Sequence, residues 1–112
     1  MKDDLTYIEH INECIDKIKR FTSQLTWEDF NSNEMVQDAV IRNIEIIGEA
    51  AKQISNKFRE QYTDIPWKEI TGMRDKLIHD YMGVDTEIVW NTVRTDIPYL
   101  KNCFIKTNLN SC

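Results

Sequence analysis

Apolar side chains recur every three or four positions along most of this chain, and that spacing constrains the fold more than any other feature. The first such run consists of Leu5, Ile8, Ile11, Ile15, Ile18 and Phe21. Residues at this spacing share one face of an α-helix, so the run predicts a helix from about Asp4 to Phe21 with one buried face. Only 3 Gly and 2 Pro occur among the 112 residues, which leaves few interruptions to helix. We therefore expect an all-α fold.

The length and composition indicate one soluble domain. A chain of 112 residues can form one hydrophobic core but not two, and 41% apolar with 29% charged residues is typical of a globular domain. We expect a single domain over residues 1–107 and a frayed tail over residues 108–112, where Asn108, Asn110 and Ser111 replace the apolar pattern. No run approaches the roughly 20 apolar residues of a membrane span, and the first residues lack the layout of a signal peptide. We therefore expect a cytoplasmic protein with no membrane contact.

The charge and the ligand inventory exclude several classes of protein. The 14 Lys and Arg residues against 19 Asp and Glu give a net charge of −5, the opposite of a general nucleic-acid coat, so any RNA contact must be local. The three cysteines, Cys14, Cys103 and Cys112, contain no Cys-x-x-Cys spacing, and the chain has only two histidines, His10 and His79. We expect no disulfide framework, no metal site and no cofactor, although carboxylates alone could hold Mg²⁺.

The remaining helices are predicted from apolar spacing and end signals. Trp27 and Phe30 predict a short helical turn packed on the bundle. A long second helix is capped by Ser32 or Asn33 and reaches Ser55 or Phe58. A third runs from Ile65-Pro66 to about Tyr81, and Gly72 loosens it. A fourth is capped by Asp85 or Thr86 and is interrupted or restarted at Pro98.

The second helix carries more apolar surface than one partner layer requires. One stripe consists of Val36, Val40, Ile47, Ala51, Ile54 and Phe58, and a neighbouring stripe consists of Met35, Ala39, Ile46 and Ala50. A helix that faces a single layer needs a stripe of only about 100°. The surplus predicts that a second subunit covers this helix; the alternative is that the rest of the chain wraps it.

The segment from Arg74 to Tyr81 carries the candidate chemistry. With Ile70 as reference, Leu77 and Tyr81 lie within about 60° of the buried face and His79 lies opposite. Asp75 precedes His79 by one turn, where its carboxylate can accept a hydrogen bond from one imidazole nitrogen and orient the ring. Arg74 falls about 40° from Ile70, close to the apolar face, where a permanent cation needs an anion.

Each of these residues also has a purely structural interpretation. His79 and Asp75 could be solvated surface groups, Arg74 could pair with Glu45 or Glu49 inside the bundle, and Tyr81 could be a core aromatic residue. In an unbroken helix His79 and Tyr81 also lie about 160° apart and cannot easily reach one target. Either the helix ends near Asp80, or the functional groups converge across a subunit boundary.

The order Arg-x4-His-x-Tyr over Arg74 to Tyr81, with Asp75 directly after the arginine, resembles the signature of the HepT-like branch of the HEPN superfamily. The flanking segments are similar to that family in order and spacing; they are residues 38–42, residues 45–51, Ile65-Pro66-Trp67 and Trp90 with Asp96-Ile97-Pro98. The resemblance covers nearly the whole chain.

This resemblance implies a HEPN-type up-and-down bundle of four to five helices that dimerises with both motifs facing a shared cleft. It further implies a metal-independent endoribonuclease toxin of a type VII toxin-antitoxin system. In that system Arg74 and His79 would be catalytic, Asp75 would orient His79, and tRNA or mRNA would be the substrate. The cognate antitoxin, a minimal nucleotidyltransferase, would neutralise the toxin by AMPylation of Tyr81. The alternative is a non-catalytic helical module that binds a nucleotidyltransferase or a nucleotide.

Overall fold

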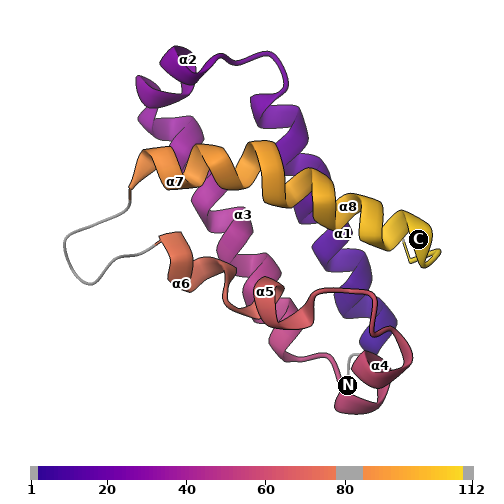
Figure 1. Ribbon diagram of the computed structural model, residues 1–112. Helices are drawn as coiled ribbons and strands as arrows, with labels where there is room; N and C mark the ends of the chain where they lie inside the picture. The colour runs from indigo at the N-terminus through magenta and orange to yellow at the C-terminus, as the bar shows by residue number, and fades with distance from the viewer. Residues whose placement is uncertain (1–2, 78–84, 110–112) are drawn as a thin grey trace.

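The computed structural model of the chain describes residues 3–77 and 85–109, and these ranges contain helices and no strand (Figure 1). The predicted all-α class is confirmed. In chain order the helices are α1 (Asp4–Thr22), α2 (Trp27–Asn31), α3 (Glu34–Lys52), α4 (Asn56–Gln61), α5 (Trp67–Thr71), α6 (Met73–Leu77), α7 (Thr86–Asn91), the π-helical segment η2 (Thr92–Asp96) and α8 (Ile97–Lys106).

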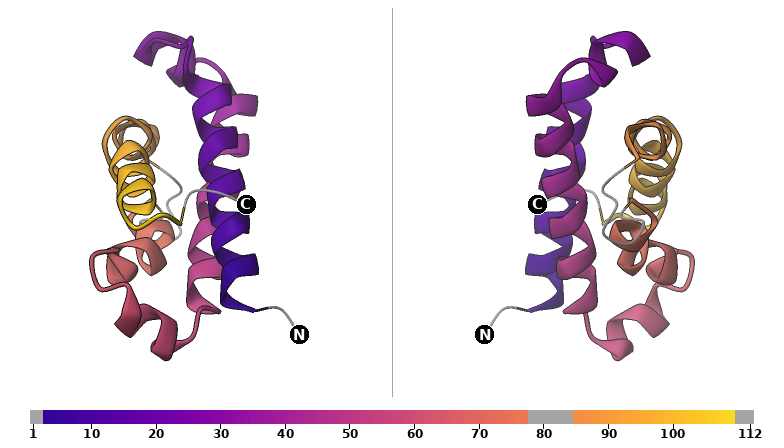
Figure 2. Two further views of the ribbon diagram at one scale, coloured as in Figure 1. Left: turned by 90° about the vertical axis from the view of Figure 1, so that its right-hand side faces the viewer. Right: turned by 90° about the vertical axis from the view of Figure 1, so that its left-hand side faces the viewer.

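The helices form two layers around one core (Figure 2). The long helices α1 and α3 pack antiparallel as one layer, while α4 to α6 and the continuous α7–η2–α8 rod form the other. The core consists of fully buried apolar side chains from both layers, among them Ile11, Ile15, Ile18, Val40, Ile44, Ile47, Ile70, Leu77, Ile97, Leu100 and Phe104. The first stripe predicted on the second helix therefore faces the interior of a single chain.

Side-chain caps begin most of these helices. Asn33 accepts a hydrogen bond from Val36 N at the start of α3, and Asp85 accepts from Glu87 N and Ile88 N at the start of α7, so one of the two alternatives predicted for each cap is confirmed. The short turn α2 is also confirmed. Phe30 is fully buried, and its ring lies 5.0 Å from that of Trp90 on α7.

The second helix is shorter than predicted because the chain turns after Lys52. Ser55 starts a separate helix, α4, by accepting a hydrogen bond from Phe58 N. The carboxylate of Asp4 accepts 2.8 Å hydrogen bonds from both the backbone N and the Oγ of Ser55, which ties this turn to the start of α1. Ile54 and Phe58 are nevertheless buried. The apolar spacing in the sequence therefore continues across the turn, and it gave no sign that the helix ends there.

The predicted third helix is broken at Gly72 into α5 and α6. Gly72 N donates to Lys68 O at 3.0 Å and closes α5, and helix resumes at Met73. Glycine has a low helix propensity, which explains the break at this position. The description of this region ends at Leu77, so His79, Asp80 and Tyr81 lie outside the described residues.

The ends of the chain differ from the predicted pattern in two respects. Leu5 and Phe21, predicted on the buried face of α1, are 59% and 38% exposed because, at 100° per residue, they fall on the two margins of the arc that Ile11, Ile15 and Ile18 occupy. Leu109, predicted in the frayed tail, is buried. Asn108 adopts a left-handed φ of 65°, which lets Leu109 N donate to Phe104 O at 2.7 Å.

The rod formed by α7, η2 and α8 accommodates Pro98 without a stop. The π-helical segment η2 precedes α8, and Pro98 lies in the first turn of α8, where a missing backbone N–H is tolerated. Within the described residues, no helix has the length and apolar character needed to traverse a lipid bilayer.

Candidate active site

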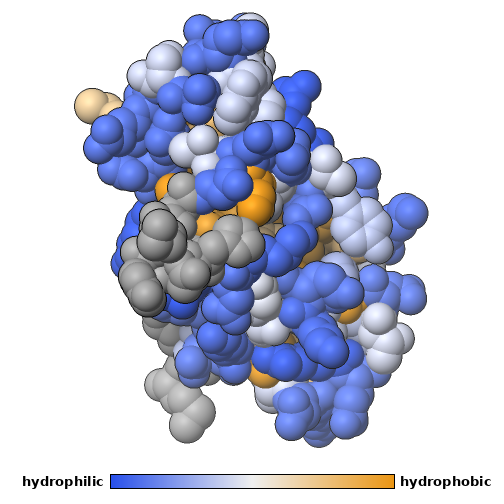
Figure 3. All heavy atoms as spheres, turned by 60° about the vertical axis from the view of Figure 1, so that its left-hand side comes forward, coloured by the Kyte–Doolittle hydropathy of each residue, from blue (hydrophilic) through white to orange (hydrophobic). Residues whose placement is uncertain are grey.

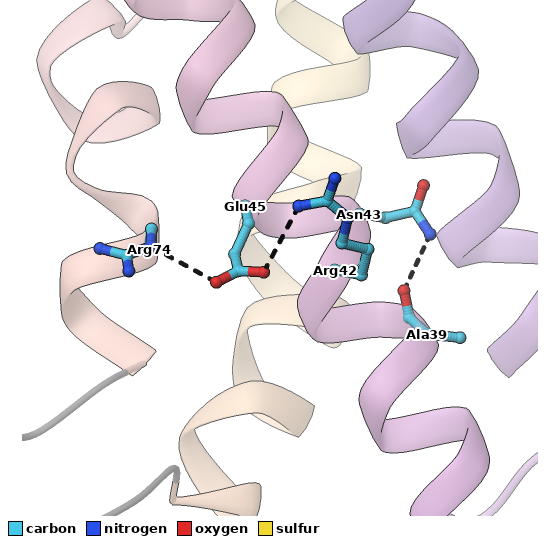
Figure 4. Close-up of polar contacts among 5 residues, drawn as sticks. All are labelled: Ala39, Arg42, Asn43, Glu45 and Arg74. Carbon is cyan, nitrogen blue, oxygen red and sulfur yellow. Dashed lines mark hydrogen bonds and ion pairs between the residues drawn. The ribbon is translucent and has the colours of Figure 1, made fainter. Parts of the chain in front are cut away.

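Arg74 on α6 and Glu45 on α3 meet at the surface of the bundle (Figure 4). Met73 and Leu77 bury one face of α6 in the core, which places the intervening Arg74 beside α3. Arg74 Nε donates to Glu45 Oε2 at 3.4 Å, and the two side chains are 47% and 25% exposed. This pair is the one named in the structural interpretation of Arg74, with Glu45 rather than Glu49 as the partner, although it lies at the surface and not inside the bundle.

The position of the Arg74 guanidinium differs from the prediction. A regular helix from Ile70 would turn Arg74 toward the apolar face, whereas its side chain is about half exposed. The break at Gly72 interrupts the regular 100° spacing on which that projection depended. Moreover, a long arginine side chain can carry its charge past apolar neighbours to the surface.

A second arginine contacts the same carboxylate. Arg42 lies one turn before Glu45 on α3, and its Nη1 lies 4.0 Å from Glu45 Oε1 (Figure 4). The neighbouring side chain of Asn43 is buried and donates to Ala39 O at 2.8 Å on its own helix. Arg42 itself is 65% exposed, and sequence reasoning did not assign it to the site. Its spacing to Glu45 is visible in the sequence, but the proximity of Glu45 to Arg74 depends on tertiary packing.

Asp75 extends the cluster on the other side of Arg74. Its Oδ1 lies 3.8 Å from Arg74 Nη1, and its side chain is 75% exposed. One guanidinium therefore lies between two carboxylates. The predicted contact of Asp75 with His79, and the position of Tyr81, lie outside the described residues, so the structure brings together Arg74, Asp75, Glu45 and Arg42 only.

A separate cavity of about 220 Å³ lies between α5, α6 and α8. Ile70, Met73 and Leu100 line it, and an ion pair of Lys76 Nζ with Asp96 Oδ2 at 3.1 Å is part of its wall. Because Lys76 is two residues after Arg74, the two side chains project from opposite sides of α6. Across residues 3–77 and 85–109, no three His, Cys, Asp or Glu side chains are grouped closely enough to share a metal ion.

The family model described as "Ribonuclease HepT-like" matches residues 11–106, which include the whole segment from Arg74 to Tyr81. The chain belongs to the HepT-like ribonuclease family. The resemblance inferred from the Arg-x4-His-x-Tyr motif is thereby confirmed, and with it the assignment to the HEPN superfamily.

Relatives in archaea and bacteria share this domain over most of its length. A protein of Thermococcus cleftensis described as a probable ribonuclease HepT is 51% identical over 89% of this chain and 91% of its own length. A protein of Methanocaldococcus jannaschii named as a gamma-glutamylcyclotransferase and candidate RNase is 50% identical over 94% of this chain but only 47% of its own length. A candidate RNase of Caldanaerobacter subterraneus is 46% identical over 90% of both chains. No solved structure matches this sequence.

Proposed function

We propose that this HepT-like chain is an endoribonuclease toxin that cleaves RNA through attack of the substrate's own 2′-hydroxyl. The observation that carries the proposal is the family match across the domain, which includes the complete Arg-x4-His-x-Tyr motif. The structure adds that Arg74, the first residue of the motif, presents its guanidinium at the surface rather than in the core. A cation at the surface can reach a phosphate of RNA, whereas a buried one cannot.

The chemistry follows from the residue types and requires no metal ion. His79 removes the proton of the 2′-hydroxyl, the 2′-oxygen bonds to phosphorus, and the bond from phosphorus to the 5′-oxygen breaks as that oxygen gains a proton from a histidine. Arg74 stabilises the negative charge on the phosphorane-like transition state, and Asp75 orients His79. Proton transfer of this kind contributes typically about 10² to 10⁴-fold to a rate. The products are a 2′,3′-cyclic phosphate and a 5′-hydroxyl.

A homodimer would bring two motifs to one cleft. On the second apolar stripe of α3, Met35 is 82% exposed and Ala39 and Ile46 are partly exposed, whereas Ala50 is buried. Hydrophobic side chains also reach the surface of an otherwise hydrophilic face of the molecule (Figure 3). A second subunit seated on the stripe would cover these residues and resolve the angular separation of His79 and Tyr81, because groups from two subunits can approach one RNA from different sides.

Regulation by a separate nucleotidyltransferase antitoxin completes the proposed type VII system. The Tyr81 phenol oxygen attacks the α-phosphorus of ATP, pyrophosphate leaves, and AMP remains on the tyrosine. The added phosphodiester and its bulk would repel and block RNA at the cleft. Mass spectrometry of protein co-expressed with the antitoxin should find AMP-sized increments on Tyr81. The RNA substrate of the unmodified toxin is tRNA or mRNA of the cytoplasm.

The test compares purified wild type with Arg74→Ala and His79→Ala on total tRNA in a buffer that contains EDTA. We expect both variants to keep the wild-type helical content and mass in solution and to lose cleavage and growth inhibition. Arg20→Ala removes an exposed arginine from α1, away from the motif, and should cleave as wild type does. Full activity in either active-site variant would overturn the assigned roles. Tight binding of the nucleotidyltransferase with no RNA products from wild type would instead favour the non-catalytic module.

A further inference from the structure

Arg42 and Arg74 keep unused hydrogen-bond donors on the solvent side of Glu45. A guanidinium carries five N–H donors in a planar fork. Arg74 directs Nε to Glu45 and Nη1 to Asp75, and Arg42 directs only Nη1 to Glu45, at the long distance of 4.0 Å. Glu45 is the least exposed of these groups, so the arginine side chains extend outward from it.

The formal charges of the cluster show why Arg42 matters for binding an anion. Arg74 with its two carboxylate neighbours, Glu45 and Asp75, forms a group with one net negative charge, which would repel a phosphodiester. Arg42 brings the group of four to neutrality and adds the guanidinium with the weaker carboxylate contact. In a chain whose net charge is −5, no general positive field compensates for the loss of such a cation.

Glu45 also shows that the two guanidiniums can share one anion. Each of its oxygens faces a different arginine, Oε1 toward Arg42 and Oε2 toward Arg74 (Figure 4). The two non-bridging oxygens of a phosphodiester offer the same pattern, two acceptors on one atom that share a negative charge. Guanidinium groups match this geometry well.

We infer that Arg42 is a second backbone-binding residue of the site and that it and Arg74, brought together at Glu45, hold the same phosphodiester of RNA. The inference rests on the proposed function for the identity of the ligand. It assigns Arg42 to the phosphate and leaves proton transfer to the motif residues. Because Arg74 stabilises the transition state on this same phosphodiester, removal of Arg42 should weaken RNA binding and lower kcat/KM for cleavage.

The experiment measures binding of a fluorescein-labelled, 2′-O-methylated RNA 20-mer by anisotropy, because such an RNA has no free 2′-hydroxyl to attack. We expect Arg42→Ala to weaken binding by roughly fivefold to tenfold, a range set by a partly exposed charge-assisted contact. Arg20→Ala removes the same charge from an exposed position on α1 and should bind within twofold of wild type. Thermal unfolding of both variants should match wild type, since the Arg42 side chain is 65% exposed. Equal binding by wild type and Arg42→Ala would overturn the inference.

The double variant tests whether the two arginines share one phosphate. If they do, the losses of affinity in Arg42→Ala and Arg74→Ala combine to less than their product, because either change alone already disrupts the same contact. Losses that multiply independently would show separate binding points and contradict the shared site. Failure of the ribonuclease proposal has a different signature: wild type would yield no RNA products, while the binding losses of Arg42→Ala and Arg74→Ala would persist.

Discussion

Arg74 combines a half-exposed side chain with two carboxylate neighbours, and this combination depends on the shape of arginine. Its Nε and Nη1 groups face different carboxylates, which leaves the rest of the planar fork for a ligand. The ammonium of lysine is one compact charge and cannot direct donors to Glu45 and a phosphate in the same fixed geometry.

Arg74→Lys therefore tests geometry separately from charge. We expect normal folding and a loss of at least about tenfold in kcat/KM for RNA cleavage, because a hydrogen bond to a charged group contributes roughly 1.5–3 kcal/mol. Initial rates on a labelled RNA, with circular dichroism as the folding control, provide the measurement. Cleavage by Arg74→Lys at the wild-type rate would mean that a positive charge alone suffices.

Asn12 connects α1 to Leu109, the last residue that the structure describes. Its side chain is 3% exposed, and its Nδ2 donates to Leu109 O at 2.7 Å and to Ile8 O at 3.3 Å. Asn12→Ala leaves the Leu109 carbonyl without this donor, and we expect a loss of about 1–3 kcal/mol in the free energy of unfolding. Urea titrations followed by circular dichroism measure the change. Asn102→Ala, at an exposed position of α8, should change the stability by less than about 0.5 kcal/mol, and an equally small effect of Asn12→Ala would show that the contact contributes little.

At the scale of the helix, α3 provides both a core face and the proposed dimer face. Met35 is 82% exposed, so a charge at this position costs the isolated subunit little, whereas it would be buried in the proposed dimer. We expect Met35→Glu to shift sedimentation equilibrium toward the monomer without lowering the thermal stability of the subunit. Ile105→Glu makes the same change at a 49% exposed position of α8 and should leave the dimer intact. A Met35→Glu protein that dimerises as tightly as wild type would move the interface away from this stripe.

Helix starts were predictable from the sequence because caps act over a few residues. Asn33 and Asp85 cap α3 and α7 through hydrogen bonds to backbone N–H groups two or three positions later. Interior breaks were harder to predict. Ile54 remains buried after α3 has ended, and Ile70 and Met73 are both buried on either side of Gly72. Buried apolar residues can keep the same three-or-four-residue spacing across a tight turn as within a helix, so this spacing does not show where a helix is interrupted.

Only those residues of the site that lie in one short sequence segment were predictable. Arg74 and Asp75 belong to a short motif, and Glu45 or Glu49 was expected as a partner of Arg74, but the apolar surroundings predicted for Arg74 were not found. The choice of Glu45 over Glu49, and the presence of Arg42 on the same carboxylate, depend on how α6 docks on α3. That docking depends on the whole core and has no signature in any one segment.

At the scale of the whole molecule, the net charge of −5 limits how much RNA the protein can hold. Binding to single strands releases counterions in proportion to the phosphates contacted, with a log–log salt slope of about −0.7 for each. We expect a slope no steeper than about −3, which corresponds to a few phosphates near the arginine pair. Anisotropy with the 2′-O-methylated RNA between low and physiological salt measures this slope. A slope near that of a nucleic-acid coating protein would show an extended contact surface.

The dimer makes a further prediction about how the motif is divided between subunits. On an unbroken helix Arg74 and His79 would lie about 140° apart, so we expect the RNA to take Arg74 from one subunit and His79 from the other. We expect Arg74→Ala and His79→Ala each to be inactive alone, whereas a mixed dimer would contain one composite site with both residues intact. An equal mixture, co-expressed with two different affinity tags and then assembled at random, should recover about a quarter of wild-type cleavage, because half of the dimers are mixed and each has one of two sites complete. Dimers purified through both tags should reach about half. If doubly tagged dimers are as inactive as either parent, both residues must come from the same subunit, or all four must act together.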